Sequence, residues 1–110
     1  MSPRDKKRKN KRPEEEPRYV ISVAARILGT QTYTLRYYER IGIIEPFRSS
    51  GNIRLYSESD IVRLRRVRSL IEELGVNLAG VEVIMHMVDR INDLQRQVEA
   101  LERLTGNKDE

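Results

Sequence analysis

Residues 19–42 read YVISVAARILGTQTYTLRYYERIG, and this stretch decides the fold. Ser22 precedes a short apolar run that ends at Gly29, which predicts a helix of about two turns with a hydroxyl cap and a glycine stop. A second helix is predicted over residues 32–40, before Gly42. Two short helices joined by a glycine turn indicate a helix-turn-helix, although this spacing alone is a weak signal.

The residues that follow predict a β-hairpin and a third helix. Extended runs at 46–48 and 53–56 flank residues 49–52, where Gly-Asn can supply the positive φ values of a tight turn. Ser57 stands three residues before Asp60, a spacing typical of a helix start. One face of the helix after it carries Ile61, Leu64, Val67, Leu70, Ile71 and Leu74. Its opposite face carries Arg63, Arg65, Arg66 and Arg68, some of which are in i+4 reach of Glu72 or Glu73.

A last, long helix is predicted from Leu78 to about Leu104, with Asn77 as its cap. Apolar residues in it alternate steps of three and four, a heptad pattern of about three repeats: Ile84, Met87, Ile91, Leu94, Val98 and Leu101. At about 1.5 Å per residue such a helix is roughly 40 Å long, more than a domain this small can cover. We therefore expect the stripe to pair with a second chain.

Composition narrows the classes of function. The chain of 110 residues has no cysteine and a single histidine, His86, which excludes disulfides and leaves too few ligands for an ordinary zinc site. It has no apolar run that would span a membrane and no secretory signal, so a cytoplasmic protein is expected, and one that binds DNA is nucleoid-associated. Neither a phosphate-cradling glycine loop nor a second histidine supports enzyme chemistry, and no cofactor or metal is predicted.

The charge is unevenly distributed around a net of +4. Residues 1–17 carry seven Lys or Arg against four Asp or Glu, and almost no apolar side chains, so they are predicted to be a disordered basic arm. Three interpretations of this arm stay open: a solvated tail, a segment that binds DNA phosphates non-specifically, or a nuclear-import signal if the source is a eukaryote. We expect a DNA-binding domain over 18–76, a dimerisation helix over 77–104 and a short tail over 105–110.

The residues themselves resemble a known family. Residues 19–25, the run LRYYERIG at 35–42 and RLYS at 54–57 look like the winged DNA-binding module of the MerR family, over residues 19 to about 75. Residues 77–81, NLAGV, and the short length further resemble the HspR-type heat-shock repressors within that family. The fold class expected is therefore mainly α: a winged helix-turn-helix domain with a small β-hairpin wing, followed by a long coiled-coil dimerisation helix.

The resemblance implies a sequence-specific repressor that binds double-stranded DNA as a homodimer on an inverted repeat. It also implies that the two dimerisation helices pair in antiparallel orientation. Control of chaperone or heat-shock genes, with the chaperone DnaK as a co-repressor, is implied by resemblance alone. No sensor residues follow the dimer helix, so no small-molecule effector is expected. Two other classes remain open: an architectural DNA-binding protein with little sequence preference, and a coiled-coil adaptor that has lost DNA binding.

The residues expected to contact DNA lie on two elements. The second helix contributes Thr32, Tyr33, Thr34, Arg36, Tyr37 and Tyr38. The wing contributes Arg48, Asn52, Arg54 and Tyr56. We expect Tyr37 to be partly core and Tyr38 to reach DNA, and both Arg36 and Arg54 to be exposed. By resemblance Arg36 contacts the phosphate backbone, although a guanine contact stays open.

Overall fold

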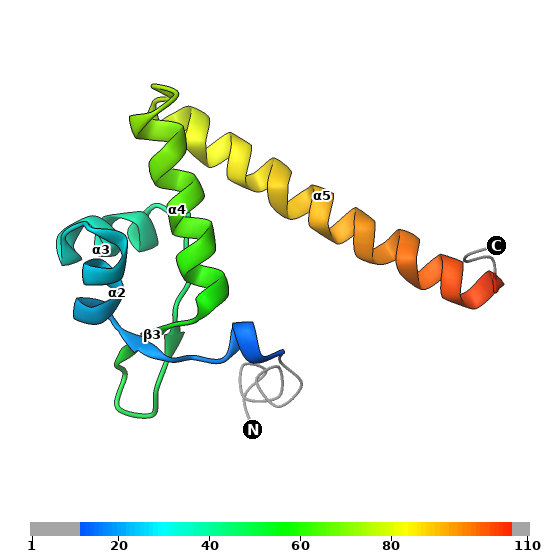
Figure 1. Cartoon of the computed structure of the whole chain (residues 1–110), viewed down its shortest axis with the longest axis horizontal. Helices are drawn as coiled ribbons and strands as arrows, with labels where there is room; N and C mark the ends of the chain where they lie inside the picture. Colours follow the sequence, from blue (N-terminus) through cyan, green and yellow to red (C-terminus); the bar gives the residue numbers. More distant parts are fainter. Residues whose placement is uncertain (1–11, 107–110) are drawn as a thin grey trace. The chain divides into compact units, whose positions relative to one another are not determined.

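The computed structural model describes residues 12–106, and the chain forms two compact units, one ending at Gly75 and one beginning at Val76 (Figure 1). The first unit contains, in chain order, η1 (Pro13–Glu15), β1 (Tyr19–Val20), α2 (Ile21–Leu28), α3 (Thr32–Arg40), β2 (Phe47–Arg48), β3 (Arg54–Tyr56) and α4 (Glu58–Glu72). The second unit consists of α5 (Leu78–Thr105). The expected fold class, mainly helical with a small sheet and a long C-terminal helix, is confirmed.

The turn between α2 and α3 is made by Gly29. Its φ of 69° is left-handed, and its N–H donates to the carbonyl oxygens of Ala25 and Arg26, which closes the end of α2 as predicted. The predicted cap at Ser22 is wrong. β1 runs directly into the helix, so extended Val20 is the cap residue and Ser22 lies inside the first turn.

The sheet has three antiparallel strands in the order β1-β3-β2, one more than the predicted hairpin. β1 joins through the register Tyr19 opposite Tyr56. In the wing loop, the Asn52 N–H donates to the Ser49 carbonyl at 2.8 Å. Asn52 (φ 63°) is the only non-glycine residue with a left-handed φ between residues 12 and 106, so of the Gly-Asn pair it is the asparagine that turns the chain.

The helix α4 starts as the sequence predicts. The Ser57 hydroxyl accepts from the Asp60 N–H at 3.1 Å, and the Asp60 carboxylate accepts from the Ser57 N–H at 2.9 Å, a complete capping box. Its predicted apolar face is buried at Ile61, Leu64 and Val67, and Leu70 and Ile71 are half-buried. Leu74 is 71% exposed, because α4 ends at Glu72 and the predicted face does not continue past it.

Part of the predicted disordered arm has regular structure. Residues 13–15 form the single 3-10 turn η1, which lies against α4. Pro13 is the first residue of η1, and its ring fixes the backbone φ angle near the value that this turn requires. The prediction for the rest of the arm, residues 1–11, lies outside the described residues, as does that for residues 107–110 of the tail.

Candidate nucleic-acid interface

One face of α3 is exposed and polar, and the other is buried. Positions 33, 36, 37 and 40 share a face at i, i+3, i+4 and i+7 spacing, and all four side chains are exposed. Tyr33 is 68% exposed. The Arg40 guanidinium lies over the Tyr37 ring, 5.4 Å from its centroid, and so holds that ring at the surface. This face therefore exposes the hydrogen-bond donors of two arginines and the rings of two tyrosines to solvent.

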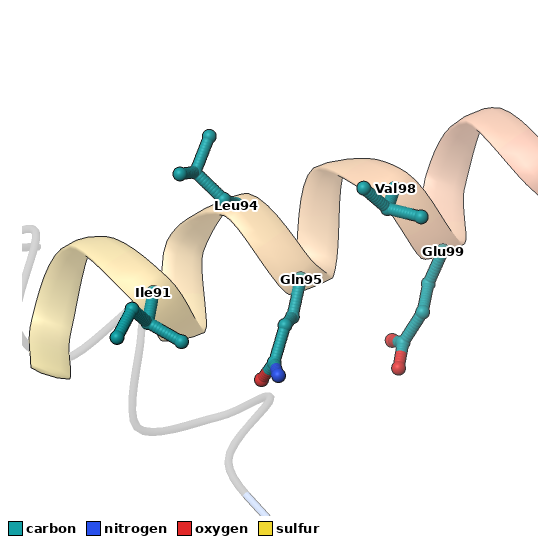
Figure 2. Close-up of a pocket in the computed structure, with 5 residues that line it drawn as sticks. All are labelled: Ile91, Leu94, Gln95, Val98 and Glu99. Carbon is teal, nitrogen blue, oxygen red and sulfur yellow. The ribbon is translucent and has the colours of Figure 1, made fainter.

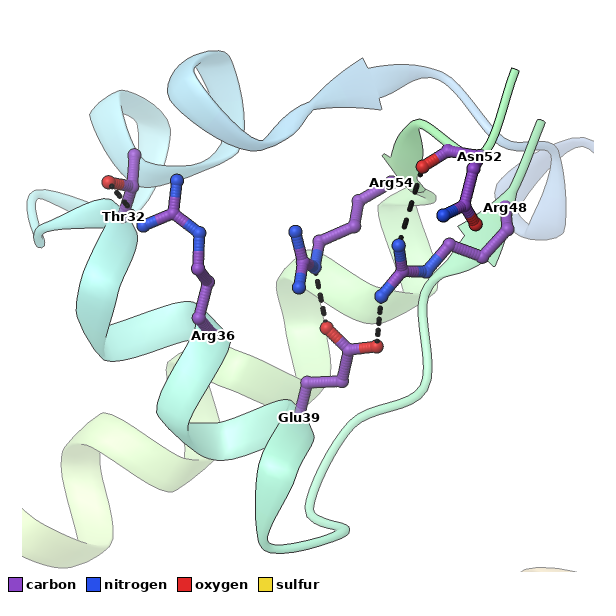
Figure 3. Close-up of polar contacts among 6 residues, drawn as sticks. All are labelled: Thr32, Arg36, Glu39, Arg48, Asn52 and Arg54. Atoms are coloured by element: carbon purple, nitrogen blue, oxygen red, sulfur yellow. Dashed lines mark hydrogen bonds and ion pairs between the residues drawn. The ribbon is translucent and has the colours of Figure 1, made fainter.

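Arg36 stands at the middle of the exposed face. Its Nη1 donates to the Thr32 hydroxyl one turn back, at 3.4 Å, which is a long and weak contact (Figure 3). Thr32 and Thr34 are half-buried at the start of the helix. The Arg36 side chain is exposed, as expected, and this hydrogen bond uses one of the five N–H donors of its guanidinium.

The two wing arginines, Arg48 and Arg54, form ion pairs with a carboxylate of α3. Figure 3 shows both guanidinium groups converging on Glu39 of α3. Arg54 Nε donates to Glu39 Oε1 at 2.6 Å, and Arg48 Nη2 donates to Glu39 Oε2 at 2.8 Å. Arg48 Nη1 also lies 3.4 Å from the carbonyl oxygen of Asn52. The expectation that Arg54 is exposed is wrong: its side chain is only 27% exposed, because the ion pair folds it toward α3.

This bridge sets the ionisation of Glu39. Burial is the largest single influence and raises its pKa, but the hydrogen bonds and charges of Arg54 and Arg48 together outweigh it and lower the pKa below the ordinary 4.5. Glu39 is therefore ionised at neutral pH. A lowered folded-state pKa means that the bridge stabilises the fold above about pH 4.5, and that this stability is lost as the pH falls through the lowered pKa.

Two tyrosines expected at the DNA are in the core instead. Tyr38 is 8% exposed, because it lies three residues from Leu35 on the buried face of α3, and Tyr37 is the exposed one of the pair. Tyr56 of β3 is fully buried. Within the described part of the chain its hydroxyl has no hydrogen-bond partner. Burial, reinforced by the negative charge of Glu39, raises the pKa of Tyr56 to about 12.

We expect Tyr56→Phe to leave DNA affinity within about twofold and not to lower the free energy of unfolding. An unpaired buried hydroxyl costs about 1–3 kcal/mol, so its removal can stabilise the domain by up to that amount. Urea denaturation and a DNA titration measure the two effects. Tyr33→Phe is the control for the stability measurement alone, because it removes an exposed hydroxyl from α3. A loss of affinity in Tyr56→Phe without a loss of stability would return Tyr56 to the interface.

The arginines of α4 divide into structural and exposed groups. Arg68 pairs with Glu72 at 3.1 Å, the predicted i+4 contact, and also donates to the carbonyl oxygen of Leu28 at the end of α2. Arg63 Nε donates to the carbonyl oxygen of Ile43 at 2.7 Å. Arg65 and Arg66 are exposed. Arg63 and Arg68 thus join α4 to the helix-turn-helix and the segment after it.

The apolar stripe on α5 lies largely open in the single chain. Ile84 is half-buried, while Met87, Ile91, Leu94, Val98 and Leu101 are between 41% and 60% exposed. A shallow hollow on this stripe is lined by Ile91, Leu94, Gln95, Val98 and Glu99, all from the one helix (Figure 2). A hollow lined by a single helix is open on its other sides, so it is not an enclosed ligand cavity.

Sequence reasoning missed Glu39. The signal that could have indicated it is the pair Arg48 and Arg54, which the hairpin places opposite each other, since facing like charges destabilise a strand pair and a nearby carboxylate offsets their repulsion. Between residues 12 and 106, no cluster of three or more His, Cys, Asp or Glu side chains could hold a metal ion. None of the described helices is both long and apolar enough to cross a membrane.

A helix-turn-helix whose second helix is exposed, together with a basic β-hairpin, defines the winged helix-turn-helix class. Residues 19–88 match the family described as MerR HTH family regulatory protein, and the chain belongs to that family. The resemblance inferred from the sequence is thereby confirmed.

Several relatives are similar over most of this chain. The HspR heat shock protein of Streptomyces coelicolor is 42% identical over 88 residues, which cover 80% of this chain and 58% of that protein. The mercuric resistance operon regulatory protein of Bacillus cereus is 34% identical over 92 residues, 69% of each chain. The chain therefore spans little more than half the length of the HspR relative.

Two solved structures share the fold. HiNmlR, a MerR family regulator lacking the sensor domain and bound to promoter DNA, superposes with a TM-score of 0.59 at 19% identity, over 80% of this chain and 78% of that one. A MerR family transcriptional regulator from Bacillus cereus gives a TM-score of 0.54 at 20% identity, over 84% and 85%. At these identities the likeness concerns the fold alone.

Proposed function

We propose that the chain is a sequence-specific DNA-binding repressor that acts as a homodimer on an inverted-repeat operator. The observation that carries the proposal is the joining of two elements: the exposed face of α3, with Arg36 at its centre, and a wing whose arginines are anchored to α3 through Glu39. In helix-turn-helix proteins that bind DNA, the second helix lies in the major groove, and cationic side chains contact the flanking phosphate backbone.

In this proposal the contacts divide by role. Thr32, Tyr33, Thr34 and Tyr37 of α3 contact base edges or phosphates, while Arg36 contacts phosphate or a guanine. On the wing, Arg48, Asn52 and Arg54 contact the DNA phosphate backbone next to the groove that α3 occupies. Tyr38 and Tyr56 have no part in it, because both are buried.

The proposed dimer forms through the α5 stripe. The stripe has six apolar residues, and full burial of one side chain of this kind stabilises an interface by about 1.5–3 kcal/mol. A second copy supplies the same stripe, so a two-fold axis satisfies both chains and requires an operator of matching symmetry.

Similarity to the Streptomyces coelicolor heat shock protein HspR supports a role in the control of heat-shock genes. We further propose chaperone genes as targets and DnaK as a co-repressor, which rest on the family resemblance alone. The proposed mechanism is simple: the bound dimer blocks access of polymerase to the promoter.

The test is a binding titration on the promoter fragment upstream of the chain's own gene and on a scrambled duplex of equal composition. A specific repressor is expected to prefer the promoter by about 10³-fold or more at the same salt concentration. Equal affinity for both duplexes would indicate an architectural protein, and no binding to either would indicate an adaptor.

A further inference from the structure

Two like charges face each other at the base of the wing. Arg48 of β2 and Arg54 of β3 are register partners in the antiparallel sheet. Like charges directly opposite each other destabilise a strand pair. Their side chains are 32% and 27% exposed, so solvent screens the repulsion less than it would at a fully open surface.

The carboxylate between them comes from a different element. Glu39 stands in the last turn of α3, and each of its two oxygens accepts from one guanidinium, at 2.6 Å and 2.8 Å (Figure 3). The Glu39 side chain is itself only 22% exposed. This single residue therefore fixes both strands of the wing to the helix that carries Arg36.

The bridge uses only part of each guanidinium. Arg54 contributes Nε, and Arg48 contributes Nη2, whereas a guanidinium has five N–H donors. The two Nη groups of Arg54 lie outside the bridge. A DNA phosphate can thus be bound by these arginines while Glu39 keeps its hydrogen bonds to them.

We propose that Glu39 is a positioning residue that determines specificity: it holds Arg48 and Arg54 at a fixed place relative to Arg36 and offsets their charge. The inference rests on the proposed DNA-binding function. When the Glu39 carboxylate is present, the wing arginines reach DNA phosphates only if α3 lies in the major groove of the preferred sequence. Without it, two uncompensated guanidinium groups can bind any phosphate in reach, because backbone contacts carry no sequence information.

The experiment compares Glu39→Gln with wild type on two duplexes. One is the duplex that wild type enriches most from a random pool, and the other is its scrambled version. Glu73→Gln is the control, because it removes one negative charge from an exposed position at the end of α4. Affinities are measured over a range of salt concentrations, at temperatures well below the melting midpoint of each variant.

We expect Glu39→Gln to bind the scrambled duplex about three- to tenfold more tightly than wild type. Its plot of log affinity against log salt should steepen by about 0.9 for each phosphate newly contacted. The preference for the selected duplex should fall at least about tenfold, while Glu73→Gln should keep the wild-type preference.

A second variant, Glu39→Asp, separates charge from position. It keeps the carboxylate but is one methylene shorter, so one carboxylate no longer reaches both arginines at hydrogen-bond distance. We expect its affinity for the scrambled duplex to stay within about threefold of wild type and its preference to fall.

An unchanged preference in both variants overturns the inference, and so does a parallel loss of affinity for both duplexes, since that is the result of a purely structural role. If wild type itself enriches no duplex, the proposed function fails, and this inference fails with it. The wild-type selection therefore distinguishes the two failures.

Discussion

Arg36→Ala is expected to lower operator affinity by two orders of magnitude or more while leaving the melting midpoint almost unchanged. The side chain is exposed, and its contact within the chain is the 3.4 Å hydrogen bond to Thr32, so folding depends little on it. A dimer loses two such contacts, each worth about 1.5–3 kcal/mol for a charged hydrogen bond. Binding titrations on the operator and on scrambled DNA, with melting curves alongside, measure both effects.

The ratio of the two affinities tells which partner Arg36 has. A phosphate contact lowers both affinities in proportion, whereas a guanine contact lowers the preference itself. Arg65→Ala, which removes the same charge from an exposed position on α4, is the matched control and should have a much smaller effect. Full affinity in Arg36→Ala would remove this residue from the interface, and a large fall in the midpoint would make it structural.

Ile91→Lys is expected to split the dimer and to lower operator affinity by about three orders of magnitude. Ile91 is 53% exposed in the single chain and lies in the middle of the α5 stripe, so a dimer built on that stripe would bury two like charges there. Once the chains separate, each half-site binds alone, and the effective concentration of about millimolar that links them is lost. Light scattering over a range of concentrations measures the mass.

Asn92→Lys supplies the control, since it adds the same charge to the next residue, which is exposed and off the stripe. It should stay dimeric and bind the operator like wild type. If Ile91→Lys also remains a dimer, the chains pair through another surface and the proposed role of the stripe is wrong.

Most of the helices could be predicted from the sequence because their signals are local. Gly29 and the Ser57–Asp60 capping box mark their helix ends through backbone geometry and neighbouring hydrogen bonds. The strand β1 could not be predicted with the same precision. Two residues carry little periodicity, and their pairing with β3 is a contact between residues 37 positions apart, Tyr19 and Tyr56.

The candidate site was only partly predictable for a similar reason. The exposed face of α3 follows from helical spacing, but which of two adjacent tyrosines is buried depends on the rotation of the helix against its neighbours. For this reason the prediction that Tyr38 reaches DNA is wrong. Glu39 lies nine residues from Arg48 and fifteen from Arg54, so their bridge exists only once the wing has folded back onto α3.

The central claim is that two copies of the chain bind DNA through α3 and the wing on a symmetric site. Selection of duplexes from a random pool by the wild-type protein, followed by sequencing, tests it most directly. The account predicts an enriched inverted repeat whose half-sites are related by a two-fold axis, bound by two chains. A pool without an enriched sequence, or an enriched single half-site bound by one chain, would contradict it.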